Sequence, residues 1–268
     1  MGAQGECRAA VQRAVGPRLH AAWARRGPGG YPALFGWRAG VSVPATCLPE
    51  WRNAFRIVNS AYPPIAVFED TLDAEDLELA FAIEAMTNDR LLEEAGQLNR
   101  VPPHDRVAGP GSSPIMAAFT HIGRSSRFTD GSYGVYYCAN TLDAAIAETR
   151  FHMAGFLAAT REASVEVTMR TYINTITQPL HDVRVGYPEL HDPDPATYPR
   201  GQKFASRLRA EGAWGILYHS VRQLGHECAA VLRPPALSIP IQGPHLRYVW
   251  DGRAQAVSHV LEVTERRG

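Results

Sequence analysis

The sequence predicts an α+β fold with a mixed or antiparallel β core and flanking helices. Short apolar runs rich in β-forming residues outnumber the helical patterns, and the two kinds of segment do not alternate regularly. The pair Asp251–Gly252 lies between two strand-like runs and indicates a hairpin. A parallel α/β fold would instead show strands and helices in regular alternation.

Length and composition are typical of a globular protein with a full core. The chain has 268 residues, of which 45% are hydrophobic and 20% charged, and we expect one large domain. Basic and acidic residues number 27 each, and this balance argues against nucleic acid as a direct partner. No apolar run can span a bilayer and no signal-peptide pattern is present, so we expect a cytoplasmic protein without a membrane partner.

The first 50 residues differ from the rest in composition. An Ala- and Arg-rich stretch at 9–26 is followed by a Gly/Pro-rich break at 27–30. The basic residues fit a solvated helix face or a partner surface. We expect 1–50 to be an N-terminal extension packed on a main domain that covers 51–268.

The main domain begins with a predicted strand, Ala54–Ser60. Arg56 stands among apolar residues in this strand. Because burying an unpaired guanidinium is costly, Arg56 either reaches solvent or meets an anion. Asp73 caps a predicted helix that ends near residue 88, and Ile115 to His121 is predicted as a further short strand.

The segment from Ser126 to His152 predicts a glycine turn, a strand and a helix. Val135–Ala139 is apolar and rich in β-formers, Thr141 is a suitable N-cap, and the residues after it favour helix. Glu148 lies on the alanine-rich surface of this helix, where core packing would favour an apolar residue. This carboxylate therefore has a functional role, or else pairs with a basic neighbour on a solvated face.

The C-terminal half predicts five strands, one helix and a long loop. The strands are Ser164–Ile176, Trp214–Tyr218, its hairpin neighbour Glu227–Leu232, and the pair Arg247–Trp250 and Ala254–Val263. The loop covers His181–Tyr198, and the helix covers Gly201–Ala210 with Gly212 as its stop. Ser220 follows the second of these strands.

Several kinds of catalytic site are disfavoured because their motifs are missing. The chain has no GxSxG motif, so Ser220 is a poor candidate nucleophile. It has no HExxH motif and no CxxC pair among its four cysteines, which argues against a metal site. The glycine loop Gly109–Ser113 lacks the spacing of a phosphate-binding loop and is predicted to be structural. Cys138 and Cys228 are predicted to be buried and unpaired.

A small set of polar and aromatic residues remains. Arg56 and Arg127 can hold a pyrophosphate, and Tyr137 can stack on a flat ring. Glu148 can hydrogen-bond a ribose hydroxyl and stabilise positive charge at the anomeric carbon. This set suits cleavage of the N-glycosidic bond of a dinucleotide such as NAD+, whose cationic nicotinamide leaves without a general acid. Alternatively, Arg127 only braces a turn.

Three sequence blocks resemble the RES-domain family in their order and spacing. They are FRIVNS, SRFTDGSYGVYYCANTLDAAIAETRFH and GAWGILYHSVRQLGHECAAVLRP, and the resemblance runs from about Phe55 to Trp250. The family comprises toxins of bacterial Xre–RES toxin–antitoxin modules and is named for an Arg, a Glu and a Ser. The resemblance implies a fold similar to that of ADP-ribosyltransferases, with a cleft for NAD+.

The resemblance also implies site residues. The implied catalytic residues are Glu148, Arg56 and Ser220, and the implied NAD+ contacts are Arg56, Arg127, Tyr137 and Ser220. We add Tyr62, which follows the first predicted strand, to the expected NAD+ contacts. The first 50 residues exceed the length of compact family members.

The function implied by the resemblance is that of a toxin that consumes NAD+ as its substrate and needs no cofactor. Family members degrade NAD+ by phosphorolysis or hydrolysis, or transfer ADP-ribose to a protein such as phosphoribosyl pyrophosphate synthetase. Expected partners are therefore NAD+, inorganic phosphate or a protein acceptor, and a cognate Xre-type antitoxin that blocks the cleft. The non-enzymatic alternative is a nucleotide-binding regulatory module.

Overall fold

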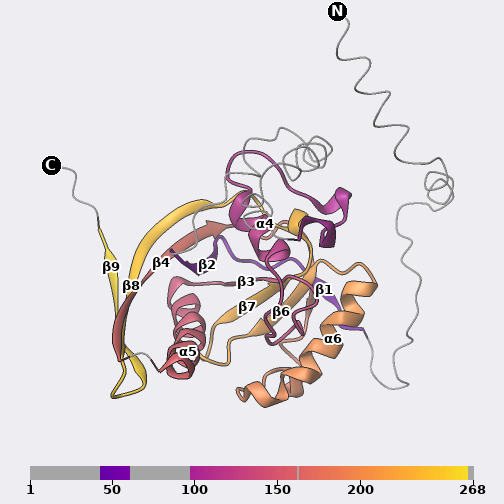
Figure 1. The fold of residues 1–268 in the computed structure, drawn as a ribbon. Helices are drawn as coiled ribbons and strands as arrows, with labels where there is room; N and C mark the ends of the chain where they lie inside the picture. Colours follow the sequence, from indigo (N-terminus) through magenta and orange to yellow (C-terminus); the bar gives the residue numbers. More distant parts are fainter. Residues whose placement is uncertain (1–42, 61–96, 162, 265–268) are drawn as a thin grey trace, which may run out of the picture. The chain divides into compact units, whose positions relative to one another are not determined.

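The computed structural model describes residues 43–60, 97–161 and 163–264. Their central element is a nine-stranded sheet in the order β1-β5-β6-β7-β3-β2-β4-β8-β9 (Figure 1). Strands β5 and β6 run parallel, and every other neighbouring pair in this sheet is antiparallel. A mixed sheet with a few helices agrees with the predicted α+β class, whereas the likeness to ADP-ribosyltransferases stays a prediction.

The described elements are bounded as follows. The strands are β1 Thr46–Cys47, β2 Ala54–Asn59, β3 Tyr136–Ala139, β4 Ser164–Asn174, β5 Leu180–Asp182, β6 Gly215–His219, β7 Glu227–Val231, β8 Ile241–Asp251 and β9 Ala256–Val263. The helices are α4 Ser113–Thr120, α5 Leu142–Thr160 and α6 Tyr198–Ala210. Short 3-10 helices are η2 Leu98–Arg100, η3 Pro103–Asp105, η4 Pro188–Leu190, η5 Pro195–Thr197 and η6 Pro234–Ala236.

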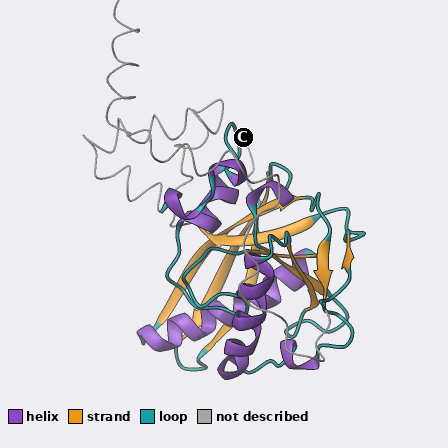
Figure 2. Ribbon diagram, turned by 90° about the vertical axis from the view of Figure 1, so that its right-hand side faces the viewer, coloured by secondary structure: helices purple, strands orange, loops and turns teal. Residues whose placement is uncertain are grey.

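The sheet has an apolar layer on each face, and helices lie on both sides of the strands (Figure 2). One layer contains α5 and α6, and we call this side the α5 face. The other contains α4 and is called the α4 face. Because side chains alternate along a strand, Tyr137 lies on the α5 face, whereas Tyr136 and Cys138 lie on the α4 face.

Helix α5 begins where its local signals predict. The Oγ1 atom of Thr141 accepts a hydrogen bond from the backbone N–H of Ala144 at 3.2 Å, so Thr141 caps the helix. Asp143 in the first turn interacts favourably with the helix dipole. The helix runs for 19 residues and ends at Arg161, whose backbone is left-handed with φ of 58°. Glu148 therefore lies within the first two turns.

The prediction of a strand at Ile115–His121 was wrong, because this segment lies in helix α4 and its C-cap. Pro114 occupies the first turn of the helix, where its missing N–H has no cost. Met116 and Phe119 are buried at helical spacing. A short apolar run does not distinguish a strand from a buried helix, and here the proline was the informative signal.

Most C-terminal predictions are confirmed, with shifted boundaries. Strands β6 and β7 pair as the predicted hairpin, and Gly212 follows α6 with φ of 82°. Strands β8 and β9 also pair, but four residues, 252–255, connect them rather than two. The Asp251 carboxylate accepts hydrogen bonds from the backbone N–H groups of Arg253 and Ala254, which stabilises this longer turn.

Part of the predicted N-terminal extension belongs to the sheet. Strand β1 lies within residues 1–50, and Thr46 and Cys47 pair with β5. The rest of the extension, the helix predicted at 73–88, and Tyr62 lie outside the described residues. The division into 1–50 and 51–268 stays a prediction.

Gly134 lies where the chain entering β3 passes close to the backbone of α4. A Cβ atom added here would lie 2.3 Å from both the carbonyl oxygen of Ala118 and the Cα of Phe119. Because these are backbone atoms, Gly134→Ala is expected to lower the free energy of unfolding by about 2 kcal/mol, measured by urea denaturation. Gly155→Ala is the control, since nothing lies within 4 Å of its added Cβ; equal losses in both variants would contradict the clash.

Candidate functional site

The candidate site is centred on the carboxylate of Glu148. Its Oε1 atom accepts a hydrogen bond of 2.7 Å from the Oγ of Ser220, which follows Glu148 by 72 residues in the chain. Glu148 is half-buried on α5, and Ser220 is buried directly after β6. The fold therefore brings together two of the predicted site residues.

The hydroxyl of Ser220 is fully used in this arrangement. Its oxygen accepts hydrogen bonds from the backbone N–H groups of Arg222 at 3.2 Å and Gln223 at 3.0 Å. A serine hydroxyl has one proton and two acceptor positions, so the proton is directed at Glu148. Ser220 thus orients the carboxylate rather than acting as a nucleophile, and no hydrogen bond from the described residues occupies Oε2 of Glu148.

Cys228 forms part of the wall behind the carboxylate. Its Sγ lies 3.9 Å from Oε1 of Glu148. Burial raises the pKa of this thiol well above its usual value, and the charge of Glu148 acts in the same direction. Cys228 therefore stays protonated. It and Cys138 are buried and free of disulfides, as the sequence predicts.

Arg127 holds the loop between β5 and α6, residues 183–197, which we call the β5–α6 loop. Its Nη1 donates hydrogen bonds of 2.9 Å to the carbonyl oxygens of Leu190 and Asp192. The guanidinium carbon lies 4.8 Å from the ring centroid of Tyr198. Nη2 is buried and has no hydrogen-bond partner among the described residues. Nη2 is thus available to a ligand, and the predicted NAD+ contact of Arg127 stays a prediction.

Two basic side chains near Glu148 were not among the predicted site residues, although His152 was a possible partner of Glu148 on a solvated helix face. The guanidinium carbon of Arg222 lies 3.4 Å from the ring centroid of Phe151, and its Nη2 donates to the carbonyl oxygen of Pro193 at 2.5 Å. His152 follows Glu148 by one helical turn. Desolvation by the surrounding protein lowers the pKa of His152 below its usual value. The positive charges of Arg222 and Arg127 act in the same direction, and the negative charge of Glu148 opposes them. The spacing from Glu148 to His152 was a usable signal; nothing local marked Arg222.

A cavity of about 430 Å³ lies beside His152. Its lining residues are Ser125, His152, Pro195, Ala196, Tyr198, Pro199 and Gln202. Gln202 is fixed there, because its Nε2 donates to the Oγ of Ser125 at 2.8 Å and to the carbonyl oxygen of Ser126 at 2.9 Å. This volume is in the range of small-molecule sites.

Arg56 lies on the opposite side of the sheet from Glu148. Its guanidinium carbon is 4.4 Å from the ring centroid of Tyr136 on the α4 face, and its Nη1 donates to the carbonyl oxygen of Tyr137 at 3.1 Å. Desolvation lowers the pKa of this guanidinium. The structure thus does not bring Arg56 together with Glu148, because Arg56 alternates with Ile57, which belongs to the α5 face.

Tyr137 lies on the α5 face and braces the turn before it. Its hydroxyl lies 2.8 Å from the Oγ of Ser126 and accepts a hydrogen bond from the backbone N–H of Phe128 at 3.0 Å. Burial raises the pKa of Tyr137 to about 12, so the phenol stays neutral. Its predicted stacking on a ligand stays a prediction.

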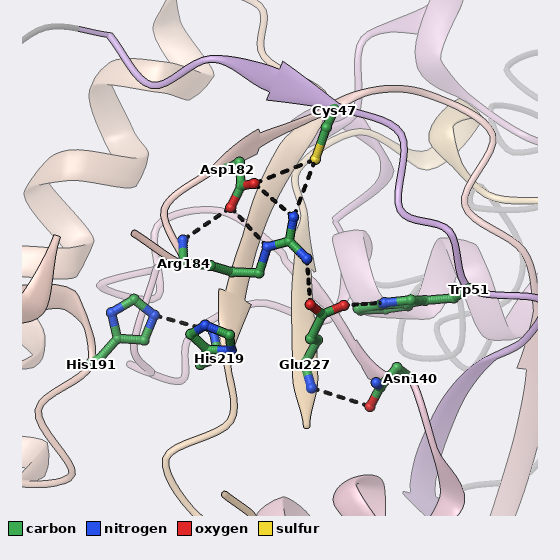
Figure 3. A network of polar contacts seen from close by, with 8 residues as sticks. All are labelled: Cys47, Trp51, Asn140, Asp182, Arg184, His191, His219 and Glu227. Carbon is green, nitrogen blue, oxygen red and sulfur yellow. Dashed lines mark hydrogen bonds and ion pairs between the residues drawn. The ribbon is translucent and has the colours of Figure 1, made fainter. Parts of the chain in front are cut away.

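A second polar network joins strands β5 and β7 to the residues between β3 and α5 (Figure 3). Arg184 binds the carboxylate of Asp182 through Nε at 3.0 Å and Nη2 at 2.7 Å, and its Nη1 donates to Glu227. Trp51 also donates to Glu227, at 2.6 Å. The backbone N–H of Glu227 donates to the Oδ1 of Asn140 at 3.2 Å, just before α5. The bond to Asn140 holds the chain entering α5, which carries Glu148, against strand β7 of the hairpin that carries Ser220.

Comparison of the sequence with protein families identifies the family of this chain. The family model of the RES domain matches residues 100–251, a range that contains both Glu148 on α5 and Ser220 directly after β6. The chain belongs to the RES-domain family. It is also similar to the uncharacterized protein y4oC of Sinorhizobium fredii, with 30% identity over 205 residues that cover 74% of this chain and 83% of the relative.

Two features of the described part of this RES domain bear on the site and its surroundings. Residues 43–60, 97–161 and 163–264 contain no group of three His, Cys, Asp or Glu side chains placed to hold a metal ion. In the same ranges, no helix has the length and apolar character needed to cross a membrane.

The RES-domain match begins after β2, so Arg56 lies outside it.

Proposed function

We propose that this RES-domain protein cleaves the nicotinamide–ribose bond of NAD+ and acts as the toxin of a toxin–antitoxin pair. The observation that carries the proposal is a single carboxylate, Glu148, whose Oε1 is held by Ser220 at 2.7 Å while Oε2 is left for a substrate. Membership in the RES-domain family supports the same reaction.

The proposed reaction needs only one carboxylate. As the bond between ribose C1 and the nicotinamide nitrogen breaks, its electron pair moves to the cationic ring, which leaves as neutral nicotinamide. Glu148 stabilises the positive charge that develops on the ribose and accepts a hydrogen bond from a ribose hydroxyl. Phosphate or water then forms the new bond to C1; when water attacks, its proton passes to solvent.

The charges around Glu148 suit a substrate with anionic phosphates and one cationic ring. Arg222 lies on the same side of the sheet as Glu148, and the buried Nη2 of Arg127 has no hydrogen-bond partner among the described residues. Cationic side chains favour a pyrophosphate, and the carboxylate favours the nicotinamide ribose. The cavity beside His152 accommodates part of a nucleotide.

The direct test incubates the purified chain, free of antitoxin, with NAD+ in phosphate and in phosphate-free buffer. Mass spectrometry then resolves the products. ADP-ribose 1″-phosphate formed only with phosphate identifies a phosphorylase, and ADP-ribose in both buffers identifies a glycohydrolase. Labelled ADP-ribose on a protein instead identifies a transferase. NAD+ that is bound but intact in every arm contradicts the proposal and favours a regulatory module.

Ser220→Ala tests the orientation of the carboxylate. We expect kcat for NAD+ cleavage to fall roughly tenfold or more, because a hydrogen bond to a charged group is lost. KM should change little, since the substrate contacts remain. Initial rates over a range of NAD+ concentrations measure both constants. Ser132→Ala is the control, because the Ser132 hydroxyl bonds only the exposed Asp130; an unchanged kcat in folded Ser220→Ala would count against this role.

A further inference from the structure

The imidazole of His191 has both ring nitrogens engaged, and its partners fix its protonation state. Nδ1 lies 3.0 Å from the carbonyl oxygen of Tyr187, which can only accept. Nε2 accepts the backbone N–H of His219 at 3.1 Å, and this group can only donate (Figure 3). His191 must therefore carry its proton on Nδ1 and none on Nε2, which is the neutral form.

The bond from His191 joins the β5–α6 loop to the residue directly before Ser220. The same loop is held by Arg127 through the carbonyls of Leu190 and Asp192, and by Arg222 through that of Pro193. The loop is thus hydrogen-bonded to His219 before Ser220 and to Arg222 after it. Because Ser220 orients Glu148, the position of this loop is coupled to the carboxylate.

We propose that neutral His191 is a positioning residue for the Ser220–Glu148 pair, and that a proton on its Nε2 releases the β5–α6 loop from the end of β6. The effect on catalysis rests on the proposed function, whereas the coupling itself does not. An Nε2–H group would face the N–H of His219, so two donors would oppose each other and the bond would break.

The groups that face His191 favour its neutral form. Burial lowers its pKa, the His219 ring and Arg127 act in the same direction, and Glu189 and the Tyr187 carbonyl oppose them. The centroids of the two imidazole rings are 5.8 Å apart. Because the pKa of His191 is lower in the folded protein than in the unfolded chain, its hydrogen bond to His219 is fully formed at pH values above the usual pKa of histidine. It is lost as pH falls through the lowered pKa.

The experiment compares two substitutions, each of which preserves the hydrogen-bonding group of only one ring nitrogen. His191→Gln places an amide oxygen near the position of Nε2, where it can accept from His219 without titrating. His191→Asn keeps a donor near Nδ1 but removes that acceptor. We expect His191→Gln to extend the acidic limb of kcat/KM to lower pH. We expect His191→Asn to lower kcat/KM about tenfold at pH values where the parent His191 is neutral, and this difference should disappear where the parent His191 is protonated. An acidic limb identical in His191→Gln and the parent protein would overturn the proposal.

Two measurements that need no turnover separate this proposal from the proposed function. Imidazole ¹⁵N NMR of the full chain should show the Nδ1–H form of His191 titrating below pH 6.5, and the opposite tautomer would overturn the assignment. The protection factor of the His219 amide against hydrogen exchange should fall at least tenfold in His191→Asn and, in the parent protein, at low pH, but not in His191→Gln. If exchange behaves this way while NAD+ stays intact in all proteins, only the proposed function fails.

Discussion

Glu148→Gln is expected to slow NAD+ consumption by about 10³-fold while leaving the fold unchanged. The glutamine amide has the shape of the carboxylate, and its oxygen still accepts the hydrogen bond that Ser220 donates at 2.7 Å to Oε1. The amide carries no charge, however, so it cannot stabilise positive charge on the ribose. Nicotinamide release measures the rate, and thermal unfolding checks the fold.

The matched control for this variant is Glu166→Gln. Glu166 lies on β4 and pairs with Arg247 at 3.2 Å, with more than half of its side chain exposed. Its substitution is expected to leave the rate within twofold, because exposed ion pairs contribute little. A folded Glu148→Gln protein that consumes NAD+ at the parent rate would remove Glu148 from the mechanism.

Arg233→Met is expected to cause the largest loss of stability, about 3 to 5 kcal/mol. Arg233 donates from Nε and Nη2 to the carboxylate of Asp105, at 2.9 and 2.6 Å, and from Nη1 to the carbonyl oxygen of Gly212 at 3.2 Å. Its guanidinium carbon lies 3.9 Å from the ring centroid of Trp214. Removing it leaves the Asp105 carboxylate, only 3% exposed, without its arginine partner.

Urea denaturation followed by tryptophan fluorescence measures this loss. Arg247→Met is the control, because its exposed pair with Glu166 is expected to contribute less than about 1 kcal/mol. The double variant Arg233→Met, Asp105→Leu should recover part of the stability, since it leaves no buried unpaired charge. Equal losses in Arg233→Met and Arg247→Met would contradict the importance of the buried pair.

The parts of the site that could be predicted from sequence are those with local causes. Thr141 caps α5 through a bond to the third residue after it, so the start of the helix and the place of Glu148 on it follow from neighbouring residues. The buried strand β6 ends beside a polar residue, which pointed to Ser220. The bond between Ser220 and Glu148 joins residues 72 apart, and no local pattern contains it.

The face on which Arg56 lies could not be predicted, for a different reason. A sheet covered on one face shows alternating apolar and polar residues, which reveals the direction of each side chain. Here both faces carry an apolar layer, so β2 is apolar on both sides of Arg56. The pattern of apolar residues locates the strand but does not show on which face of the sheet Arg56 lies. The contacts of His191 and Arg222 were equally inaccessible, because they depend on how a long loop returns to the sheet.

The order of the strands in the sheet has a consequence for a chain that is still being synthesised. Strand β3 pairs with β2, which precedes it, and with β7, which is made much later. A ribosome needs roughly 4 to 14 s to add the 72 residues from Glu148 to Ser220. During that interval the residue with the carboxylate has been made, but the residue whose hydroxyl orients it has not. The nascent protein therefore carries no assembled site until the first six of the nine strands have been made.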